Sequence, residues 1–165
     1  MTTAAVITLS DKGSQGLRTD ESGPAIIEIL AQAGYDVKTA EVLPDDREAI
    51  SSTLLRLSGT VDLIVTTGGT GLSPRDVTPE ATLSVIERRV PGIAEAMRAA
   101  GMLKTQRAML SRAEAGTLRD TLIINLPGSK KAAIESLEAV IETLGHAIEK
   151  IQGGIEDCGE EKKNQ

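Results

Sequence analysis

Short apolar runs alternate along the chain with segments in which apolar residues recur every three or four positions. The runs of strand length occupy residues 4–9, 35–42, 61–65, 107–112 and 121–125. The segments with helical spacing occupy residues 23–34, 46–59, 78–89, 91–102 and 130–153. Strands and helices following one another in this order predict an α/β fold with a largely parallel sheet and helices on both faces. We expect a three-layer α/β/α sandwich around a mostly parallel sheet with an antiparallel edge.

Polar or glycine-bearing loops directly follow four of the predicted strands. They are Ser10–Asp11, Pro44–Asp45, residues 66–76 and residues 127–130. The carboxyl ends of parallel strands meet at one edge of a sheet, and ligands of open α/β sheets bind at that edge. We therefore expect these loops to converge on one site.

The segment Thr66–Gly71 (TTGGTG) is the most informative of these loops. Three glycines after a strand let the backbone approach a ligand closely and turn its N–H groups toward an anion. No Gly-Lys-Ser/Thr follows, and the loop opens no helix at the spacing of a dinucleotide fingerprint. Glycines in loops also serve as plain turns, so the residues alone leave phosphate binding and a structural turn equally open.

Two aspartates have a structural and a chemical interpretation. Asp76 lies in a turn before a predicted helix, where aspartate is common, but its carboxylate could also hold Mg²⁺ against phosphate oxygens. Asp45 and Glu48 have the spacing of a capping box, and the spacing favours Asp45 as a helix cap. Gly128–Lys131 opens the last predicted helix and adds a weak signal for an anion.

Composition removes several classes of function. The net charge is −6 and the pI about 4.9, and Tyr35 is the only aromatic residue, so neither a basic face nor a base-stacking platform for nucleic acid is available. The single histidine, His146, lies off the apolar stripe of its predicted helix, and the single cysteine, Cys158, lies in a polar C-terminal segment. Catalysis would then depend on carboxylates, backbone amides, hydroxyls, lysines and a hard metal ion.

The chain carries no sign of a membrane span or a secretory signal. No apolar run approaches the roughly 20 residues that a membrane-spanning helix needs, and no basic region precedes an apolar core at the N-terminus. We expect a cytoplasmic protein with one domain over residues 1–152 and a polar tail over residues 153–165. Truncation of that tail is expected to leave activity intact.

Six sequence blocks occur together in a characteristic order. They are SDK (10–12), DESGP (20–24), LPDD (43–46), TTGGTGLSPRDVTPEA (66–81), LSRA (110–113) and LPGS (126–129). This set resembles the molybdopterin adenylyltransferase family of molybdenum cofactor biosynthesis (the MogA/MoaB type). The resemblance covers residues 4 to about 151, and the block over residues 66–81 is its most specific part.

The resemblance implies transfer of AMP from ATP to the terminal phosphate of molybdopterin, with release of pyrophosphate and assistance from Mg²⁺. It assigns Asp45 and Asp76 as the essential aspartates and metal ligands. It also assigns a set of residues to the phosphate-facing loop and to the pterin and nucleotide pocket: Thr67, Gly68, Gly69, Thr70, Gly71, Ser10, Asp11, Asp20, Ser22, Ser111, Gly128 and Ser129. Because Asp46 follows Asp45, the choice of the essential acid rests on its alignment to Pro44.

The same resemblance implies a homo-oligomer, a trimer or a hexamer, with the molybdate-inserting enzyme of the pathway as a candidate partner. An interface on residues 91–102 is a hypothesis. Two alternatives stay open on sequence grounds. One is a non-catalytic, pterin-binding paralogue of the same fold; the other is the related domain of the molybdate-inserting step, which normally belongs to a longer chain.

Overall fold

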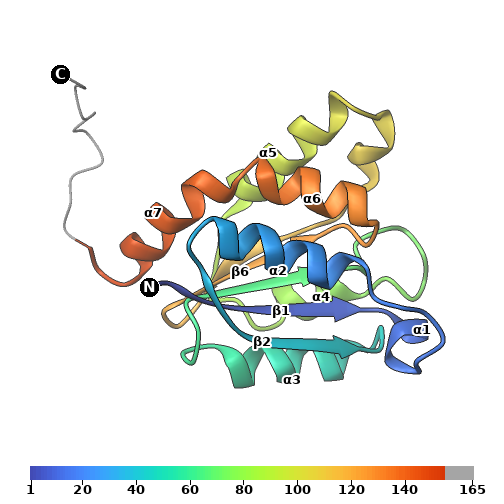
Figure 1. The fold of residues 1–165 in the computed structure, drawn as a ribbon, viewed down its shortest axis with the longest axis horizontal. Helices are drawn as coiled ribbons and strands as arrows, with labels where there is room; N and C mark the ends of the chain where they lie inside the picture. Colours follow the sequence, from blue (N-terminus) through green and yellow to red (C-terminus); the bar gives the residue numbers. More distant parts are fainter. Residues whose placement is uncertain (155–165) are drawn as a thin grey trace.

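A computed structural model describes residues 1–154 as one sheet with helices packed on both faces (Figure 1). The sheet has six strands in the order β2-β1-β3-β6-β5-β4. Their bounds are β1 Thr3–Leu9, β2 Asp36–Leu43, β3 Leu63–Thr67, β4 Arg88–Arg89, β5 Ala115–Leu118 and β6 Thr121–Leu126. The helices are α1 Asp11–Ser14, α2 Ser22–Gln32, α3 Arg47–Leu57, α4 Thr78–Leu83, α5 Pro91–Met102, the 3₁₀ helix η1 Gln106–Leu110, α6 Lys130–Glu138 and α7 Ile141–Ile151.

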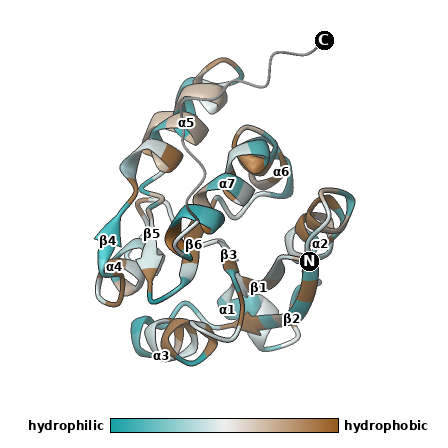
Figure 2. Ribbon diagram, turned by 90° about the vertical axis from the view of Figure 1, so that its left-hand side faces the viewer, coloured by the Kyte–Doolittle hydropathy of each residue, from teal (hydrophilic) through white to brown (hydrophobic). Residues whose placement is uncertain are grey.

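Strands β2, β1, β3 and β6 run parallel, whereas β5 pairs antiparallel with β6, and β4 antiparallel with β5. Figure 2 looks along the strands and shows α2, α5, α6 and α7 on one face and α3 and α4 on the other. The predicted three-layer sandwich with an antiparallel edge is therefore confirmed. Parallel pairing also places the ends of β1, β2, β3 and β6 at the same edge of the sheet, as expected.

Two aliphatic cores lie on the two faces of the sheet. Along β1, Ala4 and Val6 pack in the core under α2, α5, α6 and α7, and the alternate residues Ala5 and Ile7 pack in the core under α3 and α4. Successive side chains of a strand point to opposite faces, so a strand covered on both sides must be apolar throughout. This explains why the central strands are mostly apolar on both faces, while the edge strand β2 alternates between partly buried and exposed positions.

The predicted strand over residues 107–112 is wrong. These residues form most of η1, which the Thr105 hydroxyl caps by accepting a hydrogen bond from Arg107 N (3.3 Å). The strand lies further on, at β5, where the sequence lacks a strong apolar pattern because of Gly116. A Cβ at Gly116 would lie 2.6 Å from the Arg88 carbonyl oxygen, so the glycine allows β4 to approach.

Two predicted helices are shorter than the apolar spacing indicated. The helix expected over residues 78–89 ends at Leu83, and Arg88–Arg89 instead pairs with β5 as a short edge strand. The long C-terminal helix is divided into α6 and α7 by a turn at Ala139–Val140. Val140 is buried in the same core as Leu137 and Leu144, so the turn keeps the apolar sides of both helices against the sheet.

The apolar surface proposed as an interface on residues 91–102 is mostly buried in the structure. In α5, Ile93, Ala94 and Met97 are buried in the core. The exposed large apolar side chains of this region follow instead at the end of α5, in the next turn and in η1: Met102, Leu103, Met109 and Leu110.

Among the residues that the structure describes, no helix is long and apolar enough to cross a membrane. His146 lies on the exposed side of α7, as predicted, with its side chain 51% exposed. Cys158 and positions 155–165 of the predicted tail lie outside the described residues.

Candidate functional site

Hydrogen bonds join the loops that follow β3 and β6 to the start of α2. Gly68 N donates to the Leu126 carbonyl (3.1 Å), and the Thr67 hydroxyl donates to the Pro127 carbonyl (2.7 Å). The Ser22 hydroxyl donates to the Gly128 carbonyl (3.0 Å), 106 positions away in sequence. The predicted convergence of these loops on one edge of the sheet is therefore confirmed.

The turn of the glycine-rich loop depends on two residues without side chains. Gly68 (φ 104°) and Gly69 (φ 67°) have backbone conformations that L side chains rarely adopt. A Cβ at Gly68 would lie 2.3 Å from the Leu9 carbonyl oxygen, and one at Gly69 would lie 2.3 Å from the Thr78 hydroxyl. That hydroxyl, on the first residue of α4, donates to the Gly68 carbonyl (2.9 Å) and so fixes the loop against the start of the helix.

Asp45 does not cap α3. Asp46 is the N-cap, and its carboxylate accepts a hydrogen bond from Ala49 N (2.8 Å). Asp45 instead exchanges hydrogen bonds with Asp11: Asp11 N donates to Asp45 Oδ2 and Asp45 N donates to Asp11 Oδ1, both at 3.0 Å. The interpretation of Asp45 as a helix cap is thus corrected, because the capping geometry belongs to the neighbouring aspartate.

Arg75 connects the glycine-rich loop to this pair of aspartates. Its guanidinium donates to both oxygens of Asp11 (2.9 and 2.8 Å) and so lowers the pKa of that carboxyl. The pKa of Asp45 is raised instead, chiefly because the carboxyl is partly desolvated, with the negative charges of Asp11 and Asp76 adding to the effect. Asp11 is therefore paired with a cation of the protein, whereas Asp45 has no ion-pair partner among residues 1–154.

Asp76 lines the β1-side edge of the glycine-rich loop together with Asp45, and its charge helps to raise the pKa of the Asp45 carboxyl. Its Oδ2 accepts a hydrogen bond from Ser73 N (2.9 Å) and lies 2.9 Å from where a Cβ of Gly71 would be. Asp20 closes the other end of the site: its carboxylate accepts from Ser22 N and Gly23 N at the start of α2 and from the Thr8 hydroxyl. Asp20, one position before the N-cap Glu21, thus accepts the first two free N–H groups of α2.

Two adjoining cavities flank the glycine-rich loop. The first, here the β1-side cavity, has about 590 Å³ and lies against β1, the segment before α2, and Asp45. The second, the α5-side cavity, has about 490 Å³ and lies under α5 and η1. Both are lined by Gly69, Asp76, Gly128 and Ser129, so these residues form the wall between the two.

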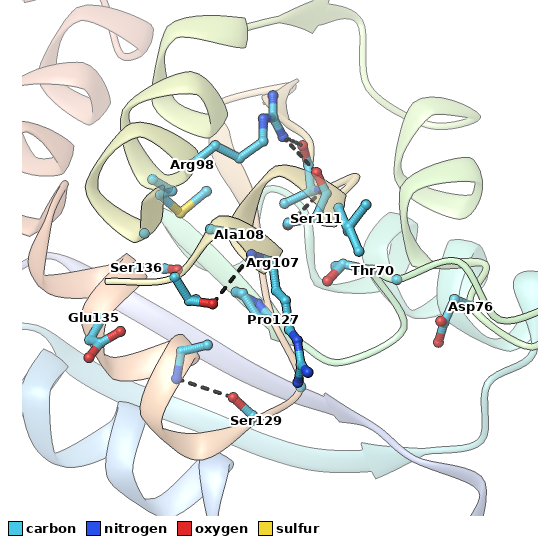
Figure 3. Close-up of a pocket in the computed structure, with 18 of the residues that line it drawn as sticks. Thr70, Asp76, Arg98, Arg107, Ala108, Ser111, Pro127, Ser129, Glu135 and Ser136 are labelled. Atoms are coloured by element: carbon cyan, nitrogen blue, oxygen red, sulfur yellow. Dashed lines mark hydrogen bonds between the residues drawn. The ribbon is translucent and has the colours of Figure 1, made fainter. Parts of the chain in front are cut away.

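The two cavities differ in their lining. Polar and charged side chains surround the β1-side cavity, among them Arg18, Asp20 and Lys130. Met97 and Leu110 line the α5-side cavity, and Figure 3 shows Arg107 extending from η1 toward Ser129 at the start of α6. Within residues 1–154, neither Arg18 nor Arg107 has an ion-pair partner.

Almost all of the predicted site residues line these cavities. The β1-side cavity contains Ser10, Asp20, Ser22, Asp45, Thr67 and Gly68; the α5-side cavity contains Thr70, Gly71 and Ser111; Gly69, Asp76, Gly128 and Ser129 belong to both. Asp11 lines neither cavity and contacts the site through its hydrogen bonds with Asp45. The roles of all these predicted site residues toward a ligand stay predictions.

Sequence reasoning missed four arginines near the site. Arg18, Arg98 and Arg107 line the cavities, and nothing in the sequence marks them. Arg112 had a signal, because it stands beside Ser111 in the block LSRA. Its guanidinium bonds the carbonyls of Gly71 and Asp76 and pairs with Glu80, and this bond lowers the pKa of the Glu80 carboxyl.

The carboxylates fit a metal ion held partly by a substrate. Among the residues that the structure describes, no group of three or more His, Cys, Asp or Glu side chains could enclose a metal. Mg²⁺ is commonly bound by one or two carboxylates together with substrate phosphates and water. Asp45 and Asp76, which both line the β1-side cavity beside a loop suited to phosphate, match that donor set, and neither has an ion-pair partner among residues 1–154.

Fold and site together define a class of protein. The family described as a probable molybdopterin binding domain matches residues 5–146, so the chain belongs to that family. In sequence it is 38% identical over 161 residues to the molybdopterin adenylyltransferase of Helicobacter pylori, covering 94% of this chain and 90% of that protein.

Two further comparisons extend this result. The crystal structure of the molybdopterin biosynthesis enzyme MoaB from Thermus thermophilus matches with a TM-score of 0.87 and 49% identity, covering 93% of this chain and 98% of that one. The molybdenum cofactor biosynthesis bifunctional protein of Chlorobaculum tepidum is 37% identical over 150 residues, which cover 90% of this chain but 48% of that protein.

Proposed function

We propose that this chain is a molybdopterin adenylyltransferase. The observation that carries the proposal is that Asp45 and Asp76 both line the β1-side cavity beside the Gly68–Gly69 turn, with Asp76 also in the wall shared with the α5-side cavity. A reaction that joins two phosphorylated molecules needs two adjacent binding spaces and a place where their phosphates meet. The 38% identity to a molybdopterin adenylyltransferase over nearly the whole chain supports the choice of reaction.

In the proposed reaction, a terminal phosphate oxygen of molybdopterin attacks the α-phosphorus of ATP. A new P–O bond forms, the bond between the α-phosphorus and the bridging oxygen breaks, and pyrophosphate leaves with the electron pair. The attacking oxygen is already ionised, so no histidine base is required. Positioning and charge neutralisation then account for the catalysis, which suits a site built from backbone N–H groups and carboxylates.

Asp45 and Asp76 would hold the Mg²⁺, which would supply charge neutralisation to the phosphates. The protein would contribute the rest through the glycine-rich loop, where backbone can approach the phosphates closely, and through Ser129 and Lys130 at the start of α6. A helix N-terminus favours a negative group through its free N–H groups and its dipole. Asp11 and Arg75 act indirectly, by fixing the backbone of Asp45 relative to the loop.

The broader setting is part of the same proposal. We expect a cytoplasmic homo-oligomer, a trimer or a hexamer. We also expect its product to pass to the molybdate-inserting enzyme. A sequence like this chain forms about half of the bifunctional protein of Chlorobaculum tepidum, an arrangement suited to consecutive steps that share an intermediate.

Adenylation of molybdopterin by the purified protein, dependent on ATP and Mg²⁺, tests the proposal. Asp45→Asn and Asp76→Asn should each lower kcat at least about 100-fold, the scale on which removal of one electrostatic group affects catalysis. Asp46→Asn is the matched control: asparagine also caps helices, so this variant loses a neighbouring charge but keeps the cap and should retain activity.

Retained pterin binding without turnover in the parent protein would instead identify a non-catalytic paralogue. Loss of activity in Asp46→Asn but not in Asp45→Asn would show that the wrong aspartate has been assigned.

A further inference from the structure

Arg112 donates four hydrogen bonds to one segment, residues 70–80. Its backbone N–H donates to the Thr70 carbonyl (2.8 Å), Nε donates to the Gly71 carbonyl (2.8 Å), and Nη2 donates to the Asp76 carbonyl (2.8 Å). Its Nη1 pairs with Glu80 at the start of α4. Four bonds from a single residue thus tie the glycine-rich loop to the helix below it.

The position of these bonds bears on the chemistry of the site. Gly71 and Asp76 bound the short segment that returns the chain from the phosphate-facing loop to the carboxylate. Holding both carbonyls on one planar guanidinium fixes the separation between the loop and Asp76. Because Arg112 lines neither cavity, it acts on the site only through these bonds.

Glu80 holds the guanidinium in turn. The side chain of Arg112 is 34% exposed, so the group is partly removed from water. The second oxygen of Glu80, Oε2, is buried and has no hydrogen-bond partner among residues 1–154. Without Arg112, Glu80 and two loop carbonyls would all lack partners, which disfavours the present loop conformation.

We propose that Arg112 is a positioning residue, which holds the glycine-rich loop and Asp76 in the arrangement that adenylyl transfer requires. The inference rests on the proposed function for its effect on turnover, but the restraint itself is a property of the fold. Lysine cannot replace arginine in this role, since one ammonium lacks the planar fork that serves two carbonyls and a carboxylate together.

The test compares Arg112→Lys with Arg119→Lys. Arg119 is a matched control, because it also donates to backbone carbonyls, those of Leu55 and Ser58, but from the turn between β5 and β6, at the opposite end of β6 from the site. Arg112→Lys should lower kcat roughly tenfold to hundredfold, the scale expected when reacting groups are slightly misplaced. It should also raise the Mg²⁺ concentration for half-maximal rate and speed amide hydrogen exchange in residues 70–76.

Arg119→Lys should leave kcat, the Mg²⁺ requirement and exchange in residues 70–76 unchanged. A kcat for Arg112→Lys within twofold of the parent would overturn the proposal. A fall in kcat no larger than the fall in the fraction of folded protein would overturn it too. If the parent protein has no activity, the proposed function fails, and amide hydrogen exchange alone tests whether Arg112 restrains residues 70–76. Equal exchange of these residues in Arg112→Lys and Arg119→Lys would refute the restraint.

Should Arg112→Lys not fold, Glu80→Gln provides the second measurement. This variant keeps an acceptor for the guanidinium but removes the charge, so exchange in residues 70–76 should still rise, by a smaller factor. No change in exchange would refute the proposal.

Discussion

The two cavities on either side of the glycine-rich loop share a wall but differ in what surrounds them. The β1-side cavity follows the ends of parallel strands and is lined with acids, hydroxyls and bases. The α5-side cavity lies under a helix and a 3₁₀ turn and is lined by residues such as Met97 and Leu110, with Arg107 reaching in. An apolar lining with few polar groups is typical of a site for a flat organic group, and a polar one suits phosphates and metal.

If the proposed function holds, this difference would let one small domain keep two substrates apart and still bring their phosphates together. The shared wall carries Gly69 and Asp76, and Asp45, the second proposed metal ligand, lies beside it in the β1-side cavity. Changes at the wall should therefore abolish the reaction, whereas changes within one cavity should affect one substrate.

The largest effect is expected at the wall. In Gly69→Ala, the added Cβ would lie 2.3 Å from the Thr78 hydroxyl and 3.1 Å from Asp45 Oδ1, at a φ of 67°. We expect kcat to fall at least about 100-fold, because the loop and Asp45 both move. Gly34→Ala is the control: it also has a positive φ, 87°, but no atom lies within 4 Å.

Both glycine variants should lose about 1–2 kcal/mol of stability from backbone strain, measured by denaturant unfolding. Only Gly69→Ala should lose turnover as well. A fully active Gly69→Ala would show that the wall does not position the phosphates.

A smaller, selective effect is expected inside the cavities. Arg107→Gln should raise the KM of one substrate roughly tenfold or more with little change in kcat, since a charge-assisted hydrogen bond contributes about 1.5–3 kcal/mol. Arg18→Gln, in the other cavity, should raise the KM of the other substrate. Lys104→Gln, which removes a charge just before η1 but lines neither cavity, should change neither KM.

Steady-state kinetics, with each substrate varied in turn, shows which KM each variant raises. If Arg107→Gln and Arg18→Gln raise the KM of the same substrate, the two cavities bind one molecule between them, and the comparison fails.

The sequence predicts the parallel part of this site better than the antiparallel part, for a physical reason. Central parallel strands are covered on both faces, so β1, β3 and β6 are buried along nearly their whole length and mostly apolar, and their ends can be located within one or two residues. Their loops must then meet at one edge, which is why the glycine-rich loop and Gly128 could be placed together. At the other edge, β4 has two residues and β5 contains Gly116, so neither has a readable pattern.

Side chains that reach the site from other segments could not be predicted. Arg107 and Arg112 lie at the two ends of the expected strand over residues 107–112, which is really a 3₁₀ helix followed by an extended residue, and the direction of a long side chain depends on that backbone. The misassigned cap has a similar cause. Asp45 and Asp46 both stand at a helix start, and only the backbone conformation, extended at Asp46, decides which one accepts from the helix.

The smallest effect is expected on stability, which the charged Asp45 carboxylate lowers. Its pKa in the folded chain lies above the ordinary value of 3.8, chiefly through desolvation. An acid with a raised pKa favours the folded state only at low pH, and this contribution is lost as the pH rises through the folded pKa. At neutral pH the charged carboxylate therefore opposes folding, and Asp45→Asn should raise the melting temperature while it abolishes activity.

The gain should be modest, about 1–3 °C, because the carboxyl is only partly buried and solvent screens its neighbours. It should disappear as the pH is lowered toward 4, where the carboxyl of the parent protein also becomes neutral. Mg²⁺ should raise the melting temperature of the parent more than that of Asp45→Asn, since the cation supplies the missing charge only to the carboxylate. A lower melting temperature for Asp45→Asn at neutral pH would mean that the Asp45 carboxylate stabilises the fold. That result would contradict its proposed role as a metal ligand held at a cost in stability.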